Sequence, residues 1–325
     1  MNAPTRRDVE AAARRLAGAV RRTPLVGSPW LSDATGADVR LKLESLQVTH
    51  SFKARGALNA ILCHAQDRPG GSVVTASAGN HGVALAWAAK AAGVPATIFT
   101  PSGAPTTKLR AIARHGASLR AVARDYDDAE RLALEHAAAE GAVYVSPYNH
   151  RDVIAGAGTI GPELIDEWPD VEIVLVPVGG GGLISGVAIA LKGTRPGIRI
   201  VGVEAENNPV LQRCLAAGRI THVDVSPTLA DGLSGNLEAG SVTFEIVAGM
   251  VDELVTVSEA ELREAMRDLV AHDHLVAEGA GVPAVAALMA GKVRVGGKNV
   301  AAIVSGSNVD VATLVEVMTG AGRQP

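Results

Sequence analysis

Short apolar segments alternate with amphipathic ones along most of the chain. The segments "VEIVLVPV" (171–178) and "KNVAAIVSG" (298–306) are almost wholly apolar, which is typical of strands that are covered on both faces. The segments "LISGVAIALKG" (183–193) and "EAELREAMRDLVAH" (259–272) lie between such runs and predict helices. Strands that are separated by helices imply parallel sheets, so the pattern predicts an α/β fold with open, mostly parallel sheets.

The same alternation runs through the first half of the chain. We expect strands in "SVVTA", "PATIFT" and "ASLRAVA", and helices over 53–66, 82–93, 106–115 and 127–140. The first residues predict an amphipathic helix ended by Pro24, and a single helix is expected from Arg151 to Glu167. Pro147 to Arg151 is the best internal boundary.

Composition narrows the possible partners. The 325 residues are 47% hydrophobic but only 3% aromatic, and the formal net charge is -4. Such a chain lacks both the stacking platforms and the basic surface of a nucleic-acid-binding protein. No apolar run has membrane-spanning length, and the N-terminus does not have the pattern of a signal peptide. The only two cysteines form no CxxC motif, so we expect reduced thiols in a cytoplasmic protein.

Four consecutive glycines in "PVGGGGLISG" lie between a predicted strand and a predicted helix. Backbone amides at a helix N-terminus form a site for an anion, most often a phosphate. The Walker A pattern fails because Gly186 is followed by Val187, and the spacing fits a dinucleotide fingerprint poorly. Glu204, at the end of the next strand, is where a ribose-binding acid would lie. A tight turn without any ligand would need fewer glycines.

Three further loops carry unusual chemistry. In "THSFKARGA", Lys53 lies beside Phe52 at a helix start, where burial and the helix dipole favour the neutral amine that forms Schiff bases. The loop "SAGNHG" suits a carboxylate or phenolate oxygen, although Ser77 can equally be a helix N-cap. In "VSGSNVD", Ser305 ends the last strand, and a ligand contact and an N-cap are equally compatible with the pattern. A phosphorylated aldehyde held by a lysine would explain all four loops.

The motifs "SFKARGA", "SAGNHG", "GGGGLISG" and "SGSN", in this order, closely resemble the serine/threonine dehydratase and serine racemase family. This family is the second fold type of pyridoxal-phosphate enzymes, as in the tryptophan synthase β chain. The resemblance runs from "RRTPL" to the last predicted helix and includes "TLADGLSGN". It implies pyridoxal 5'-phosphate as cofactor and a large domain of residues 1–71 and 150–325, with a small domain of residues 72–149 inserted into it. It also implies a homodimer or homotetramer.

The resemblance implies a role for each matching position. Lys53 would bind the cofactor aldehyde as a Schiff base and later remove the Cα proton of the substrate. Asn80 would bond the 3'-oxygen of the ring, Ser305 would face the pyridine nitrogen, and Phe52 would pack beside the ring. The cofactor phosphate would lie on Gly179, Gly180, Gly181 and Gly182. The substrate would be bounded by Ser77, Ala78, Asn80, His81 and Glu278, although Glu278 can equally be a charge at a helix N-terminus.

Three positions depart from parts of the family. Racemases carry a serine where this chain has Ala78, and a methyl group cannot deliver a proton, so we expect elimination rather than racemisation. Some relatives bind a divalent cation through the glutamate matching Glu204, but their aspartate is replaced by Val210 here. Because a hard cation needs several oxygen ligands, Glu204 is only a candidate ligand. His50 stands where relatives commonly have glycine, and it either shapes substrate access or caps the loop.

The expected activity is elimination from a 3-hydroxy amino acid such as L-threonine or L-serine, giving a 2-oxo acid and ammonia. The alternatives within the fold are a serine racemase, a β-replacing synthase and a hydroxyectoine-pathway dehydratase. A nicotinamide-binding or non-enzymatic α/β protein is the alternative from another class.

Overall fold

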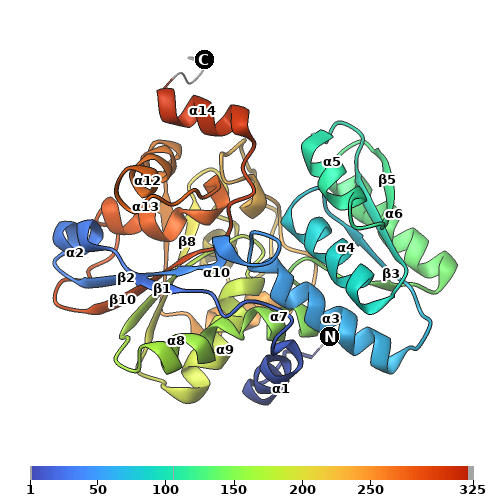
Figure 1. The fold of residues 1–325 in the computed structure, drawn as a ribbon, viewed down its shortest axis with the longest axis horizontal. Coiled ribbons are helices and arrows are strands. Elements are labelled where there is room, and N and C mark those ends of the chain that lie inside the picture. Colours follow the sequence, from blue (N-terminus) through green and yellow to red (C-terminus); the bar gives the residue numbers. More distant parts are fainter. Residues whose placement is uncertain (1, 105, 321–325) are drawn as a thin grey trace.

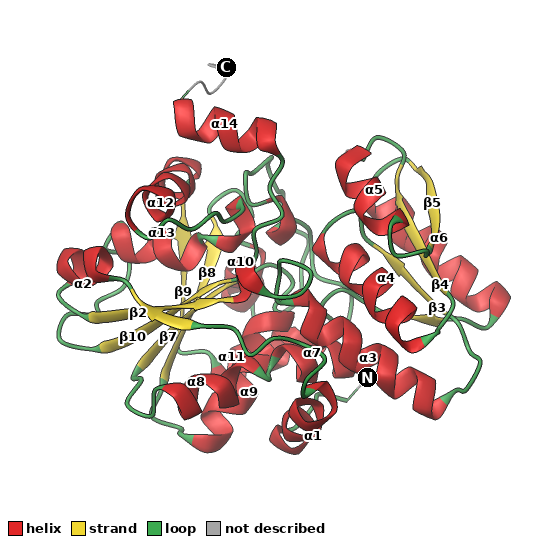
Figure 2. Ribbon diagram, viewed as in Figure 1, coloured by secondary structure: helices red, strands yellow, loops and turns green. Residues whose placement is uncertain are grey.

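The computed structural model describes residues 2–104 and 106–320, and it contains two separate sheets (Figures 1 and 2). The larger has six strands in the order β1-β2-β10-β7-β8-β9, and only the β1–β2 pair is antiparallel. The smaller has four parallel strands in the order β5-β4-β3-β6. The predicted α/β class with two mostly parallel sheets is therefore confirmed. The strand bounds are β1 (Leu25–Gly27), β2 (Asp38–Leu43), β3 (Val73–Ala76), β4 (Ala96–Pro101), β5 (Ser118–Ala123), β6 (Val143–Tyr144), β7 (Ile173–Pro177), β8 (Arg199–Ala205), β9 (Glu253–Val257) and β10 (Asn299–Val304).

Helices cover both faces of the large sheet (Figure 2). In β7, Ile173 and Leu175 belong to one core cluster, and Val174 and Val176 belong to another on the opposite face. Burial on both faces explains why this strand is apolar throughout. The first face is covered by α2 (Pro29–Thr35), α12 (Glu259–His272), α13 (Pro283–Met289) and α14 (Val311–Thr319), and the second by α8 (Ile160–Glu167), α9 (Gly182–Thr194), α10 (Val210–Ala217) and α11 (Val242–Met250).

The small sheet carries helices α4 (Asn80–Ala92), α5 (Thr106–Ala113) and α6 (Tyr126–Glu140). Helix α3 (Lys53–Asp67) lies between the two sheets in Figure 1. Its Ile61 packs in one cluster with Leu85 of α4 and Val153 of α7 (Arg151–Ala157). Because all four strands of the small sheet fall between residues 73 and 144, we propose the division into a large domain of 1–71 and 150–325 and an inserted domain of 72–149.

Two helix predictions need correction. Helix α1 (Arg6–Leu16) ends well before Pro24, because Gly18 takes a left-handed φ of 76° and turns the chain. The single helix expected from Arg151 to Glu167 is two helices, α7 and α8, separated near Gly158. There the amide of Gly161 donates to the carbonyl of Gly158 at 2.9 Å, a tight turn that interrupts the α-helical ladder.

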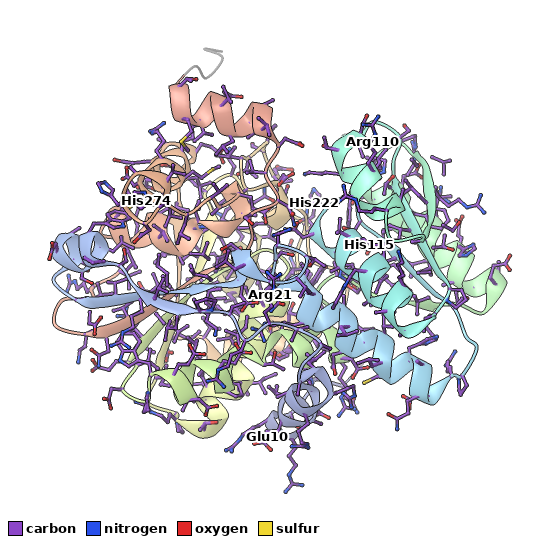
Figure 3. The ribbon with its side chains drawn as sticks, in the orientation of Figure 1. Glu10, Arg21, Arg110, His115, His222 and His274 are labelled. Carbon is purple, nitrogen blue, oxygen red and sulfur yellow. The ribbon has the colours of Figure 1, made fainter. Side chains whose placement is uncertain are left out.

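His50 has a left-handed backbone with φ of 58°, and its side chain is exposed. Its carbonyl accepts a hydrogen bond from the amide of Ser307 at 2.9 Å, which ties the loop before Lys53 to the segment that follows β10. A left-handed residue is the ordinary place for glycine. His50 therefore adopts a backbone conformation that glycine takes without strain. His274, labelled in Figure 3 beside the helices of the large sheet, has a similar φ of 56°.

In the described ranges, no helix combines the length and the apolar character that crossing a membrane requires.

Candidate active site

The loops singled out in the sequence meet between the two sheets. The glycine turn follows β7, Ser305 follows β10, and the "SAGNHG" loop follows β3, so each lies at the carboxyl end of a parallel strand, where ligands bind in α/β sheets. The amide of Phe52 donates to the carbonyl of Ser305 at 3.0 Å, which joins the start of α3 to the end of β10.

Lys53 is the first residue of α3, and its side chain is partly buried. Its Nζ donates to the carbonyl of Pro147 at 2.7 Å and lies 5.0 Å from the ring centre of Phe52. Burial lowers the pKa of Lys53 to about 8, although the nearby Glu278 opposes the shift. At pH 7 roughly one tenth of this amine is therefore uncharged, far more than for an ordinary lysine. The uncharged amine is the form that attacks an aldehyde.

The glycine turn presents free amides at the start of α9. In the part of the chain that the structure describes, no acceptor is assigned to the backbone N–H groups of residues 180–184. The Thr243 hydroxyl donates to the carbonyl of Gly180 at 2.8 Å, which fixes the orientation of that peptide. Several unsatisfied amides at the positive end of a 13-residue helix make a site for an anion such as a phosphate.

Protein atoms, and not a ligand alone, require glycine in this turn. A Cβ at Gly180 would lie 2.4 Å from Cγ of Tyr148, and one at Gly179 would lie 2.8 Å from Cα of Leu233. Gly181 has a left-handed φ of 83°. The close packing behind the turn therefore leaves no room for a side chain at Gly179 or Gly180.

Asn80 links the helices of the small sheet to the segments around the large sheet. Its amide nitrogen donates to Oε1 of Glu278 at 2.6 Å, and its carbonyl oxygen accepts from Nδ2 of Asn308 at 2.7 Å. Burial raises the pKa of Glu278 to about 7, although the bond from Asn80 opposes the shift. Glu278 is the N-cap residue of the short 3-10 turn Gly279–Gly281, as one of the two alternatives for it expects, but its side chain makes no cap bond to that turn.

The N-cap alternatives for the two serines are also wrong. The N-cap of α4 is Gly79, and Ser77 accepts a hydrogen bond from the amide of Gly79 at 3.2 Å. The buried hydroxyl of Ser305 donates to the carbonyl of Ala280 at 3.0 Å, and Asp310 is the N-cap of the next helix.

His81 is buried, and its Nε2 lies 3.2 Å from the carbonyl of Val145. Burial, reinforced by the charge of Lys53, lowers the pKa of His81 to about 3, so the imidazole is neutral. Its Nδ1 has no hydrogen-bond partner among the described residues. Ala78 lies two residues before Asn80 and is partly exposed.

Glu204 caps a helix. Its carboxylate accepts from the amides of Leu211 and Gln212 at 2.8 and 2.9 Å, at the start of α10. Burial raises the pKa of Glu204 to about 7, against the effect of these amides. Among the described residues, no group of three or more His, Cys, Asp or Glu side chains could hold a metal ion.

Sequence reasoning missed several residues that support the site. Tyr148, Thr243 and Asn308 touch the glycine turn or Asn80, but only the fold brings them there. Arg55, two residues after Lys53, is fully buried and pairs with Glu44 and Glu163 at 2.8 and 2.6 Å. It therefore anchors the start of α3 to the residue that follows β2 and to helix α8. The motif "SFKARGA" contains Arg55, and its nearness to Lys53 was the only available signal.

This α/β fold, with a lysine of lowered pKa and an anion site at the strand ends, defines an enzyme class that holds a phosphorylated carbonyl compound covalently. The chain belongs to the family described as "Pyridoxal-phosphate dependent enzyme", whose model matches residues 16–306. The resemblance drawn from the motifs is thereby confirmed, and the cofactor of the family is pyridoxal phosphate.

Named relatives are similar over nearly the whole chain. An L-threonine ammonia-lyase of Thermotoga maritima is 45% identical over 94% of this chain and 76% of its own length. The solved structure of a threonine deaminase from T.th. is 37% identical, with a TM-score of 0.87 over 94% of this chain and 99% of its own. Maize serine racemase is 32% identical, with a TM-score of 0.91 over 98% of both chains. The chain is thus similar to lyases and to racemases of one fold.

Proposed function

We propose that this enzyme eliminates water from a 3-hydroxy amino acid such as L-threonine or L-serine and releases a 2-oxo acid and ammonia. The observation that carries the proposal is the partly neutral amine of Lys53, which lies at the same strand ends as the free amides of the glycine turn. The 45% identity to an L-threonine ammonia-lyase supports the same activity.

The residues fit pyridoxal 5'-phosphate. The amides of the glycine turn would hold its phosphate, Lys53 would bind its aldehyde, and Phe52 would pack beside its ring. Asn80, which already donates to Glu278, would bond the ring oxygen, and Ser305, whose hydroxyl donates to Ala280, would face the ring nitrogen. The substrate carboxylate would lie on the loop that contains Ser77, Ala78, Asn80 and His81, with Glu278 on the substrate side of the ring.

When bound, pyridoxal phosphate supplies a sink for the electron pair that is left at Cα. Once the substrate amine has taken its place on the aldehyde, the neutral amine of Lys53 would remove the Cα proton of the substrate. The β-hydroxyl would take up a proton and leave as water, and hydrolysis of the unsaturated amine product would give the 2-oxo acid and ammonia. The hydroxyl of Ser305 is neutral, so it does not hold a proton on the ring nitrogen as a carboxylate would. The electron pair is then less deeply stabilised, which favours loss of the β-substituent over reprotonation.

A panel of amino acids tests the activity. We expect 2-oxo acid formation from L-threonine and L-serine and none from L-alanine, which has no β-leaving group. Isotope-labelled borohydride should abolish the visible absorbance of the purified enzyme and stop turnover, and the isotope should be retained on the cofactor attached to Lys53. Absence of 2-oxo acid from every 3-hydroxy substrate, with the absorbance intact, would contradict the proposed elimination. A nicotinamide-binding protein would show neither the trapped label nor the loss of colour.

Ala78→Ser is expected to introduce racemisation. A hydroxyl at this position can return a proton to Cα, and a positioned acid typically contributes about 10²-fold or more. We therefore expect D-serine formation from L-serine to rise at least about tenfold in the variant, while the wild type mainly eliminates. Chiral chromatography measures both products.

Ala78→Gly is the matched control, because it changes the size of the residue without adding a hydroxyl. Wild-type racemisation comparable with elimination, and unchanged in Ala78→Ser, would overturn the role assigned to Ala78.

Three further points belong to the proposal. Glu204 serves as the cap of α10, so we expect turnover to need no divalent cation at this position. The two cysteines, Cys63 and Cys214, are free, which fits a cytoplasmic enzyme. A homodimer or homotetramer is expected from the resemblance to the family.

A further inference from the structure

A basic pocket lies at the end of the large sheet opposite the glycine turn. It has a volume of about 360 Å³, and its charged lining residues are Arg195, Arg199, Arg294, Lys298 and Glu172. These residues surround the starts of β7, β8 and β10, which are neighbours in the sheet. Because β7 is five residues long, the pocket is separated from the glycine turn by roughly 16 Å of strand.

The positive charges of the pocket outnumber its carboxylates. Lys298 pairs with Glu172 at 2.9 Å, and Arg199 pairs with Glu253 on the neighbouring strand. Lys298, the amide of Asn299 and Arg195 together lower the pKa of Glu172, which therefore remains an anion.

Two guanidinium groups of the pocket lie in no salt bridge among the described residues, although Arg195 is near enough to Glu172 to lower the pKa of that carboxyl. Arg195 and Arg294 make no ion pair within the described part of the chain. The pocket that they line therefore keeps an excess of positive charge after its internal pairs are formed.

Arg195 supplies the second observation. Its Nη1 is buried and has no hydrogen-bond partner among the described residues. The negative end of α9 favours a cation here, since the amide of Arg195 caps that helix by donating to the carbonyl of Leu191 at 2.7 Å. Buried guanidinium donors in proteins are normally satisfied, so the unpartnered Nη1 of Arg195 is an exception. An ordinary solvated arginine would keep this nitrogen in contact with water.

We propose that this basic pocket binds a small oxyanion with two negative charges, either inorganic phosphate or a phosphate monoester. Planar guanidinium groups match phosphate oxygens in geometry and charge. The volume falls within the range of small-molecule sites, so it leaves room for the organic part of an ester. The pocket is separate from the site for the cofactor phosphate, so the oxyanion can bind while the cofactor is in place.

Calorimetric titration of the holoenzyme with inorganic phosphate, and separately with glycerol 3-phosphate, tests the site at constant ionic strength. We expect saturable binding of one phosphate per chain with no change in the visible absorbance of the cofactor. In the double variant Arg195→Gln and Arg294→Gln, the affinity should fall at least about tenfold, as expected for the loss of charge-assisted bonds. The probe that binds more tightly identifies the source of the oxyanion.

Arg213→Gln is the matched control, because Arg213 is exposed on α10, away from the pocket. Its affinity for phosphate should equal that of the wild type. If the double variant does not fold, Arg294→Gln alone changes an exposed side chain and should still weaken binding measurably. Equal affinities in all variants, or non-saturable heats, would show a solvated basic surface and overturn the site. Because binding is measured rather than turnover, this result is independent of the proposed lyase activity.

Discussion

Replacing Lys53 by alanine is expected to lower the rate of 2-oxo acid formation by at least about 10³-fold. The variant loses both the amine that holds the cofactor aldehyde and the base that removes the Cα proton. Burial lowers the pKa of Lys53 to about 8, so the wild-type amine is ready for both tasks near neutral pH. Steady-state assays with L-threonine, together with the visible spectrum of the bound cofactor, measure the loss.

Two further variants test whether the loss of activity comes from the missing Schiff base rather than from the loss of a positive charge. Lys53→Arg keeps a cation but cannot form a Schiff base, and it should be as inactive as the alanine variant. Lys90→Ala removes an exposed lysine from α4 and should retain wild-type turnover. If Lys53→Ala produced ammonia from threonine at the wild-type rate, the mechanism would be wrong.

The lowered pKa gives a second readout that does not depend on turnover. Only the neutral amine attacks an aldehyde, and the neutral fraction rises with pH through the pKa. Capture of pyridoxal phosphate by the apoenzyme should therefore accelerate through about pH 8 rather than near 10.5, the ordinary value for lysine. Stopped-flow absorbance over a pH series that spans both values measures the midpoint.

The buried centre of the fold was predictable from local pattern. Strands such as β7 and β10 are covered on both faces, so burial requires an uninterrupted apolar run that can be recognised without knowledge of the partners. Strand β2 was missed for the opposite reason. Its Lys42 is fully buried and pairs with Glu163 at 2.8 Å, so a charge interrupts the apolar pattern, and only the tertiary structure explains it. The short helices α10 and α11 were also missed.

Some features of the candidate site are also predictable from local sequence, and others depend on the tertiary structure. The local motifs predicted that Lys53 and the glycine turn begin helices, and the structure places them so. The packing of Tyr148 against Gly180 and the bond from Asn308 to Asn80 join segments far apart in the sequence, and no local pattern encodes such pairs. From the sequence alone, a bound ligand is the reason expected for the glycine run. In the structure, the protein atoms behind the turn also exclude any side chain.

Gly180→Ala is the second substitution with a large expected effect. The added Cβ would lie 2.4 Å from Cγ of Tyr148 and 2.6 Å from both Cδ atoms. The ring cannot easily move aside, because its hydroxyl accepts a hydrogen bond from the amide of Glu238 at 2.6 Å. Overpacking of this kind costs about 1–3 kcal/mol of unfolding free energy. Since the displaced turn misdirects its amides, affinity for pyridoxal phosphate should fall about tenfold, the equivalent of one charged hydrogen bond.

Thermal unfolding and cofactor titration of Gly180→Ala measure the two effects separately. Gly249→Ala is the control, because a Cβ at that helical position would meet no atom within 4 Å, and alanine there should be neutral or stabilising. In a Tyr148→Ala background the clash is removed, so adding Gly180→Ala should cost much less than it does alone. If Gly180→Ala weakened cofactor binding equally in both backgrounds, the turn would be sensitive to its own backbone rather than to Tyr148. Wild-type cofactor affinity in Gly180→Ala would exclude this turn as the phosphate site. Amides displaced by the clash would bind the phosphate more weakly.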